Sequence, residues 1–317
     1  MIAVLGEALI DLVIDHSGKV TVRPGGGPFN TARTLGRLGS SPTFLGRLSS
    51  DGFGRLLRER LSQDCVSLGI PELADAPTTL AAADVDAAGI AHYRFYLMET
   101  AAAAVAYPML SATIPSDVHA VHTGALALVM EPVAAAIERL IAHDLPPGTL
   151  LMVDPNCRPG AITDRRGYMA RLRRILSRAD VIKASVEDLA YLAPHVPAHE
   201  AAKGMLDDGA ALVLITDGPR PARAFMPGIE MKSNVPRVHV VDTIGAGDAF
   251  GGAFLAWWSR HRLTRDDLKR PELVGKALQA AADVASLTCT RPGADPPWLA
   301  EIAGRSSWEA STPDDCS

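Results

Sequence analysis

The sequence predicts a single α/β domain in which a mostly parallel sheet lies between layers of helices. Three observations lead to this prediction. From about residue 42 onward, strand-like apolar segments alternate with helix-like segments, and parallel strands joined by crossover helices are the natural outcome of that alternation. The chain has 317 residues and is 48% hydrophobic, which is enough for one large core. Two pairs of short strand-like segments break the alternation and predict a small additional β-structure.

Composition excludes several classes of protein. The formal net charge is −5, so no basic surplus suggests nucleic-acid binding. There is no window of about 18 uninterrupted apolar residues, and we therefore expect no membrane span. The start, Met1–Glu7, has no basic region and is typical of a strand rather than a signal peptide. The four cysteines show no CxxC spacing, which fits reduced thiols in a cytoplasmic protein.

The first elements place an acid and a glycine-rich turn near each other. Residues 2–5 predict a buried strand, and Asp11 follows at the edge where open α/β folds bind ligands. Asp11 suits two sugar hydroxyl groups, although by itself it is an ordinary loop carboxylate. Next, Gly25–Gly27 leave bare backbone that a ligand can approach closely. Pro28 then opens a predicted helix that ends at Gly39.

The other predicted elements follow in order. Residues 12–24 predict two short strands, and Thr79–Val85 with His92–Leu97 predict a hairpin joined through Asp86–Gly89. The further predicted strands are Thr43–Leu48, Val118–His122, Leu150–Val153, Ala211–Ile215, Ala222–Met226 and Val235–Val241, and the further predicted helices are Gly52–Gln63, Pro132–His143 and Leu273–Leu287.

The stretch from Val240 to Phe254 carries the strongest functional signal. It predicts a strand, a small-residue turn and a helix. The amides of Ala246, Gly247 and Asp248 would have no intrahelical acceptor, so the turn suits an anion, most often a phosphate. A carboxylate at Asp248 would be repelled by that anion, which favours a role as a base for an attacking hydroxyl group. The alternative is plain packing, with Asp248 as a helix cap.

The full string Asp-Thr-x-Gly-Ala-Gly-Asp, ending at Asp248, resembles the C-terminal signature of the ribokinase-like (PfkB) carbohydrate kinases. The resemblance implies that Asp248 is the catalytic base and that Gly245, Ala246 and Gly247 form the anion hole. Near the start, the Gly-Gly-x-Pro-x-Asn pattern resembles the N-terminal signature of the same family and implies that Gly26, Gly27 and Asn30 line a sugar pocket. Glu7 and Asp11 also match the opening Gly-Glu-x-x-x-Asp of the family.

Two internal motifs extend the resemblance. Asp154–Pro159 resembles the family's Asp-x-Asn-x-Arg motif and implies that Arg158 points into the cleft; its alternative role is a surface arginine that closes a loop. Ser185 and Asp188 stand where the family carries Asn-x-x-Glu, a motif tied to Mg²⁺ and phosphate. They also match a capping box with Asp in place of Glu. The residues leave open whether Asp188 caps a helix or contacts Mg²⁺ through water.

The C-terminal part completes the resemblance. Arg291–Ala294 resembles the closing Arg-x-Gly-Ala motif, and many members hold a monovalent cation between that segment and the residues around Asp242 and Ile244. The serine that often follows is replaced around Pro296 and Pro297. The candidate ligands of a monovalent cation are Asp242, Ile244 and Arg291.

The resemblance implies a ribokinase-like three-layer sandwich. We expect one kinase domain over residues 1–304, with a β-lid from about 12–24 and 79–97, and a disordered tail over 305–317. The lid would exclude water, and the alternative is a hairpin with no role at the site. The lid would also pair with a second copy, because its apolar residues have little core of their own. The residues expected to form its apolar faces are Leu80, Ala82, Val85, Tyr93, Phe95 and Leu97.

The implied function is transfer of the γ-phosphoryl group of ATP to a sugar, with Mg²⁺ as cofactor and K⁺ as a further candidate. Fructose is the first candidate acceptor; 2-keto-3-deoxygluconate, ribose, a nucleoside or a sugar phosphate are alternatives. An inactive sugar-binding regulator is the alternative from another class, and the missing GxGxxG disfavours a dehydrogenase. The candidate sugar-binding residues are Asp11, Gly26, Gly27, Asn30, Phe95 and Arg158, and the candidate nucleotide-binding residues are Lys183, Ser185, Thr216, Gly218, Gly245, Gly247 and Gly293.

Overall fold

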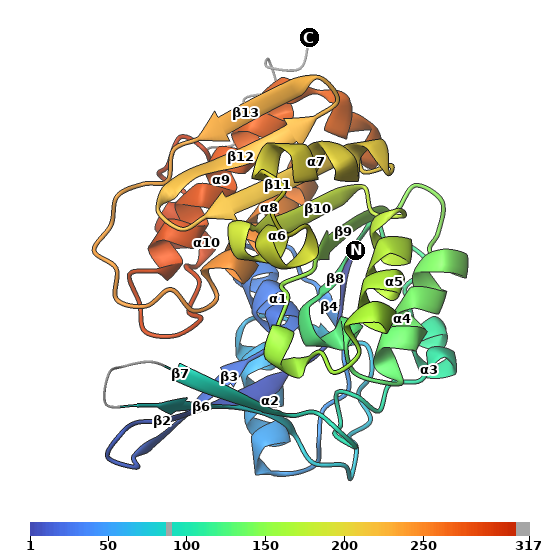
Figure 1. The fold of residues 1–317 in the computed structure, drawn as a ribbon, viewed down its shortest axis with the longest axis vertical. Helices are drawn as coiled ribbons and strands as arrows, with labels where there is room; N and C mark the ends of the chain where they lie inside the picture. Colours follow the sequence, from blue (N-terminus) through green and yellow to red (C-terminus); the bar gives the residue numbers. More distant parts are fainter. Residues whose placement is uncertain (87–90, 309–317) are drawn as a thin grey trace.

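A computed structural model describes residues 1–86 and 91–308, and its described strands form a large sheet and a small one (Figure 1). The large sheet has the order β13-β12-β11-β10-β9-β8-β1-β4-β5. It is parallel except where β12 pairs with β11 and β13. Its strands are β1 (Ile2–Leu5), β4 (Thr43–Leu45), β5 (Ser67–Leu68), β8 (Ala120–Gly124), β9 (Leu150–Asp154), β10 (Val181–Ser185), β11 (Leu212–Asp217), β12 (Arg220–Met226) and β13 (Ile229–Ser233).

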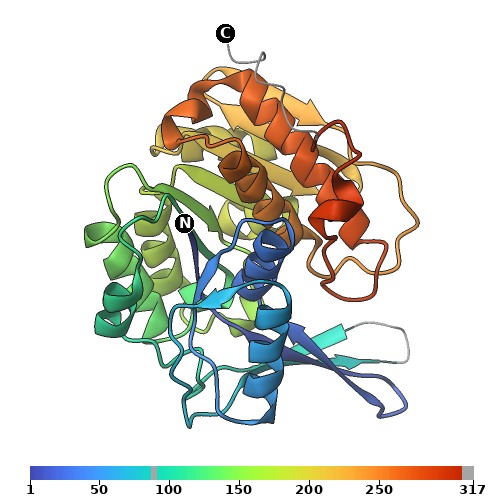
Figure 2. The same cartoon turned by 180° about the vertical axis from the view of Figure 1, so that it is seen from behind.

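Helices cover both faces of the large sheet, so the predicted three-layer α/β class is confirmed (Figures 1 and 2). Alternate residues of β1 enter separate cores, because side chains of a strand point to opposite faces: Ile2 packs with one helix layer and Ala3 with the other. One layer holds α1 (Gly27–Arg37), α2 (Gly52–Gln63), α8 (Ala246–Arg260) and α9 (Pro271–Thr288), and the other holds α3 (Tyr107–Thr113), α4 (Val133–His143), α5 (Arg165–Leu176), α6 (Val186–Leu192) and α7 (Ala198–Asp207).

The smaller sheet forms a lid with the order β3-β2-β6-β7. Its strands are β2 (Leu9–Ile14), β3 (Val20–Gly25), β6 (Thr79–Val85) and β7 (Ala91–Tyr96). Asp11 therefore lies within a strand and not in a loop. The expected connection at residues 87–89 lies outside the described residues.

The apolar residues of the two lid strands β6 and β7 are divided between the two faces of the lid. Tyr93 and Phe95 face a large cavity, together with Ala81 and Ala83. The register pairs Leu80 with Tyr96 and Ala82 with Arg94, so Leu80 and Ala82 lie on the other face. Tyr93 and Phe95 therefore face the cavity, whereas Leu80 and Ala82 belong to the outer face, because every second residue of a strand lies on the same face of a sheet.

Two predictions near the C-terminus were wrong. Residues 235–241 form no strand: Val240 and Val241 are 55% and 54% exposed, and Val241 N donates to Cys289 O of the α9 end at 2.8 Å instead of to a neighbouring strand. The expected tail is ordered as far as Trp308, which is 2% exposed and donates from Nε1 to Ala280 O at 3.2 Å. An indole buried against α9 holds this segment. Residues 309–317 lie outside the described part.

The remaining short helices are 3₁₀ helices η1 (Ala125–Leu128), η2 (Pro159–Ala161) and η3 (Arg265–Lys269) and the α-helix α10 (Leu299–Ile302). In the part of the chain that the structure describes, no helix has the length and apolar character needed to cross a membrane.

Candidate active site

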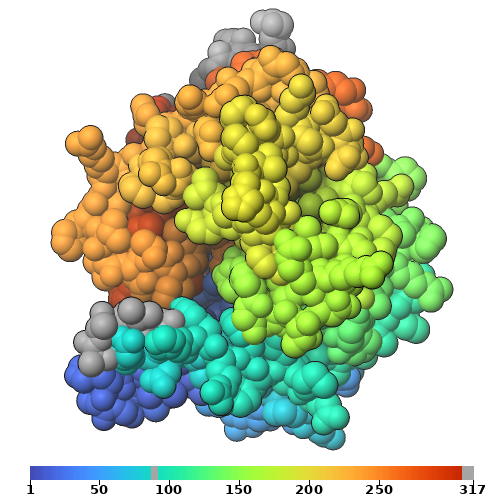
Figure 3. All heavy atoms as spheres, in the orientation of Figure 1, coloured from blue at the N-terminus to red at the C-terminus, as the bar shows by residue number. Residues whose placement is uncertain are grey.

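One cavity of about 1220 Å³ runs between the lid and the large sheet. Figure 3 shows this face of the molecule hollowed between the lid strands and the part that carries α6 and the 235–244 segment. The cavity brings together most of the residues predicted from sequence. Those that line it are Asp11, Gly26, Gly27, Asn30, Phe95, Arg158, Lys183, Ser185, Asp188, Thr216, Gly218, Ile244, Gly245, Ala246, Gly247 and Asp248.

Asp248 is a buried carboxylate beside the glycine turn of this cavity. It lies in the first turn of α8 and is 8% exposed. Its Oδ2 accepts a hydrogen bond from Asn30 Nδ2 at 2.9 Å, and its Oδ1 accepts one from Asn156 Nδ2 at 3.2 Å. Burial raises the pKa of Asp248, while the bond from Asn30 and the charge of Lys183 oppose that rise. A carboxylate whose pKa is raised is a stronger base than a solvated aspartate.

The turn before Asp248 is built to leave amides open. Gly245 caps α8 with a left-handed φ of 76°, where a side chain is disfavoured. A Cβ there would also lie 2.4 Å from the Cβ of Ala294. The amides of Gly247 and Asp248 donate to no acceptor among the described residues, as expected for the first turn of a helix. The turn therefore offers two N–H groups at the positive end of α8.

A buried ion pair lies beneath the turn. Lys183 Nζ of β10 lies 2.8 Å from Asp154 Oδ2 of β9, and both side chains are about 5% exposed or less. Burial alone would lower the pKa of Lys183, but Asp154 outweighs it and raises that pKa. A Cβ at Gly247 would lie 2.9 Å from the same Nζ, so the fixed positive charge sits against the turn.

Glu7, which is 1% exposed, lies at the end of the cavity that carries the Gly26–Gly27 turn. Its Oε1 accepts from Gly27 N at 3.2 Å and its Oε2 from Ala127 N at 2.9 Å. Glu7 thus joins the glycine turn to η1. Burial raises the pKa of Glu7 to about 8, while those two amides oppose the rise.

Two further side chains flank Asp248. Burial raises the pKa of Asp11 to about 6, while the nearby cation Arg158 opposes this. Arg158 is exposed and donates from Nη1 to Asn156 O and Cys157 O, both at 3.1 Å. Phe95 supplies an apolar wall beside η2, 3.6 Å from the position of a Cβ at Gly160.

At the other end of the cavity, Ser185 and Thr216 pair in register on β10 and β11. The predicted capping box is present: Ser185 Oγ accepts from Asp188 N at 3.1 Å, and Asp188 Oδ2 accepts from Ser185 N at 2.8 Å. Asp188 Oδ1 accepts from Cys157 N at 2.6 Å. Both carboxylate oxygens therefore have hydrogen-bond partners within the protein. Among the described residues, no group of three or more His, Cys, Asp and Glu could hold a metal ion.

Asp242, Arg291 and Gly293 do not line the cavity. Asp242 accepts hydrogen bonds from Ile244 N at 3.0 Å, Gly293 N at 2.9 Å and Arg23 Nη1 at 2.8 Å. The Arg291 side chain pairs with Glu301. This cluster lies behind the turn that carries Asp248.

Sequence reasoning missed Asn156, Asp154 and Arg23 as members of this site. Asn156 belongs to the Asp-x-Asn-x-Arg motif from which only Arg158 was chosen, so that motif held the signal. No local pattern marks Arg23, because its partner Asp242 is 219 residues away.

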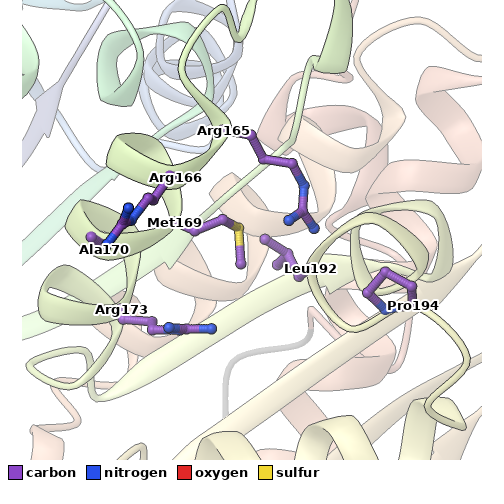
Figure 4. A pocket seen from close by; sticks show the side chains of 7 residues that line it. All are labelled: Arg165, Arg166, Met169, Ala170, Arg173, Leu192 and Pro194. Atoms are coloured by element: carbon purple, nitrogen blue, oxygen red, sulfur yellow. The ribbon is translucent and has the colours of Figure 1, made fainter.

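A second pocket, of about 700 Å³, lies outside this site on α5 and the end of α6 (Figure 4). It is lined by Arg165, Arg166, Met169, Ala170, Arg173, Leu192 and Pro194. None of these is a carboxylate or a hydroxyl that could take a proton from a substrate. The chemistry therefore points to the larger cavity.

Comparison with known proteins agrees with this geometry. The pfkB family carbohydrate kinase description matches residues 1–301. A fructokinase of Rhizobium leguminosarum bv. trifolii is 33% identical over 300 residues, covering 93% of this chain and 87% of that protein. The structure of a Xylella fastidiosa fructokinase with bound ATP has a TM-score of 0.85 and 28% identity, covering 95% of this chain and 96% of that one. A Vibrio cholerae O395 fructokinase with fructose, ADP and calcium has a TM-score of 0.80 and 26% identity, covering 92% and 94%.

Proposed function

Because this chain belongs to the pfkB family of carbohydrate kinases and is an ATP-dependent, fructokinase-like sugar kinase, we propose that fructose is its acceptor and that Asp248 is its base. The observation that carries the proposal is the buried carboxylate of Asp248, fixed by two side-chain amides beside the open amides of the α8 turn. A base and an anion site in contact are what hydroxyl phosphorylation requires.

The proposed reaction proceeds in one transfer. Asp248 accepts the proton of a sugar hydroxyl group as its oxygen bonds to the γ-phosphorus of ATP. The bond from that phosphorus to the β–γ bridging oxygen breaks, and ADP leaves with the bond's electrons. The amides of Gly247 and Asp248 stabilise charge on the transferring oxygens, and Lys183 adds positive charge beneath them. The lid excludes water that would otherwise accept the phosphoryl group.

Mg²⁺ fits this site as an ion carried by the nucleotide. Both carboxylate oxygens of Asp188 accept hydrogen bonds within the protein, and we propose that Asp188 contacts Mg²⁺ through water. When bound, Mg²⁺ neutralises charge on the phosphate oxygens. We propose that Ser185, Thr216 and Gly218 contact the nucleotide, with the adenine against the apolar 235–244 segment that lines the cavity.

A neutral sugar suits the acceptor end. Asp11 and Asn30 offer an acceptor and an amide for uncharged hydroxyl groups. Arg94 does not line the cavity, which removes one candidate partner for an acidic sugar. Glu99 does not line it either, so it does not repel an acidic acceptor there. Arg158 lines the cavity and keeps an acidic acceptor, such as 2-keto-3-deoxygluconate, as the second candidate.

A sugar panel tests the acceptor. We would measure kcat/KM for fructose, 2-keto-3-deoxygluconate, ribose and fructose 6-phosphate with ATP in a coupled ADP-release assay. We expect fructose to be preferred. A preference of about tenfold or more for either charged substrate, some 1.4 kcal/mol in transition-state binding, would contradict fructose as the acceptor. The kinase activity itself would still stand.

Three further proposals accompany the function. Residues 1–304 form one kinase domain with the lid as part of it. A second copy covers the outer face of the lid, where Val22 and Tyr96 are 43% and 51% exposed. The setting is cytoplasmic, supported by free thiols at Cys65, Cys157 and Cys289.

A further inference from the structure

Asp242 links the lid to the catalytic turn. Its carboxylate is 17% exposed and accepts from Ile244 N, the residue before Gly245, and from Gly293 N in the closing segment. Its third partner is the guanidinium of Arg23, on lid strand β3, with Nη1 2.8 Å from Oδ2. One carboxylate therefore ties three separate segments of the chain together behind the amides of α8.

While Arg23 is in place, the oxygens around Asp242 are poorly placed to bind a K⁺ ion. A hard cation needs several oxygen ligands free to turn toward it. Both oxygens of Asp242 already accept hydrogen bonds. Two carbonyl oxygens of the closing segment are also occupied: Ala294 O accepts from Arg33 Nη1 at 2.6 Å, and Pro296 O from Arg37 Nη1 at 2.5 Å.

The two arginines of α1 are fixed in place. Arg33 and Arg37 are 4% and 6% exposed, and their Nε atoms lie 2.5 and 2.7 Å from the two carboxylate oxygens of Asp64. Asp64 is itself 1% exposed. The segment from Gly293 to Pro296 is thus held by side-chain cations that cannot diffuse away.

We infer that Arg23 takes the place of an activating monovalent cation, so that phosphoryl transfer by this chain is independent of K⁺. The guanidinium supplies the positive charge that Asp242 needs, and Asp242 positions the turn at Ile244 and Gly245. Because Arg23 belongs to the lid, the turn is held in this way only while β3 lies close enough for Arg23 to contact Asp242. Arg23 is a positioning residue, and this inference rests on the proposed role of the Gly245–Asp248 turn.

The test compares chloride salts of K⁺ and tetramethylammonium at equal ionic strength, with kcat and Tm as separate readouts. For the wild type, we expect the kcat values in the two salts to agree within about twofold and the Tm values within about 1 °C. Arg23→Ala should lose about tenfold in kcat in tetramethylammonium, because a charge-assisted contact is removed. K⁺ should restore most of that loss and raise Tm by about 2 °C, since the vacated carboxylate now binds the ion.

Two variants serve as controls. Arg23→Lys keeps a tethered cation and should stay insensitive to K⁺. Arg94→Ala removes an exposed arginine from β7, at the opposite edge of the lid sheet from β3, and should behave as the wild type. Activation of the wild type by K⁺ of about tenfold, a loss in Arg23→Ala that K⁺ does not restore, or no loss in that variant would each overturn the inference. If no sugar were phosphorylated, the proposed function would fail while the Tm comparison still decided the role of Arg23.

Discussion

Asn30 Nδ2 donates a hydrogen bond of 2.9 Å to Asp248 Oδ2 although 218 residues separate the two in the chain. The contact exists because the first turns of α1 and α8 meet at the cavity, where Thr31 Oγ1 also lies 3.4 Å from Asp248 O. Asn156 holds the other oxygen. With both oxygens fixed, the carboxylate has one orientation relative to the turn amides, which is the preorganisation that proton transfer needs.

Asp248→Asn should lower kcat by about 10² or more, within the usual range for an acid–base group. The amide keeps the size of the side chain, so ATP and sugar should still bind, as measured by calorimetry. Turnover near the wild-type rate would refute the assignment of Asp248 as base.

Asn156→Asp should move the acidic limb of the pH–rate profile upward by about 1 pH unit. Burial already raises the pKa of Asp248, and a carboxylate at position 156 adds a like charge beside Oδ1. Since the ionised form of Asp248 is the active one, the activity that remains should recover as pH rises. Asn156→Ala is the control: it removes the hydrogen bond without adding charge, and should lower kcat with a smaller shift of the limb.

Glu7→Gln should flatten the dependence of stability on pH between pH 4.5 and 8. Burial raises the pKa of Glu7 from 4.5 to about 8, so in this window the folded state keeps a proton that the unfolded state has released. The Glu7 contribution to stability is therefore lost as pH rises, at up to about 1.4 kcal/mol per pH unit. Urea unfolding of both proteins across the window measures the difference. Parallel curves for the two would contradict this role for Glu7.

Gly245→Ala should lower both stability and kcat. The residue has a φ of 76°, and its Cβ would lie 2.4 Å from the Cβ of Ala294, so the turn must shift. The matched control is Gly204→Ala on α7, where nothing lies within 4 Å of the added Cβ. That change should stabilise the protein by about 0.5–1 kcal/mol. Thermal unfolding and kcat for the pair separate a local clash from a general effect of alanine.

Tyr96→Glu should weaken self-association if the outer face of the lid joins two copies. Tyr96 is 51% exposed and pairs with Leu80 across the strands, so a charge there would be buried at the interface. Sedimentation at micromolar concentration should show a dimer for the wild type and a larger monomer fraction for the variant. A monomeric wild type would contradict the proposed dimer.

The sequence determined the alternating architecture and most of the cavity. Periodicity predicts strands and helices because burial of one face is a local property of residue spacing, and the glycines of the α8 turn predict open amides for the same local reason. Asp248, Asn30 and Asp11 were therefore predicted from their positions in motifs. The capping box at Ser185 and Asp188 was also predicted, since its partners are three residues apart.

The tertiary structure alone decided which distant side chains share a charge or a hydrogen bond. Residues 235–241 have the composition of a strand, but a strand needs a neighbour to accept its hydrogen bonds, and here Val241 binds the end of α9 instead. Asn156 reaches Asp248, and Arg23 reaches Asp242, only after β9 and the lid are packed. No local pattern encodes such pairs, because the energy of an ion pair depends on the distance and burial that the whole fold imposes.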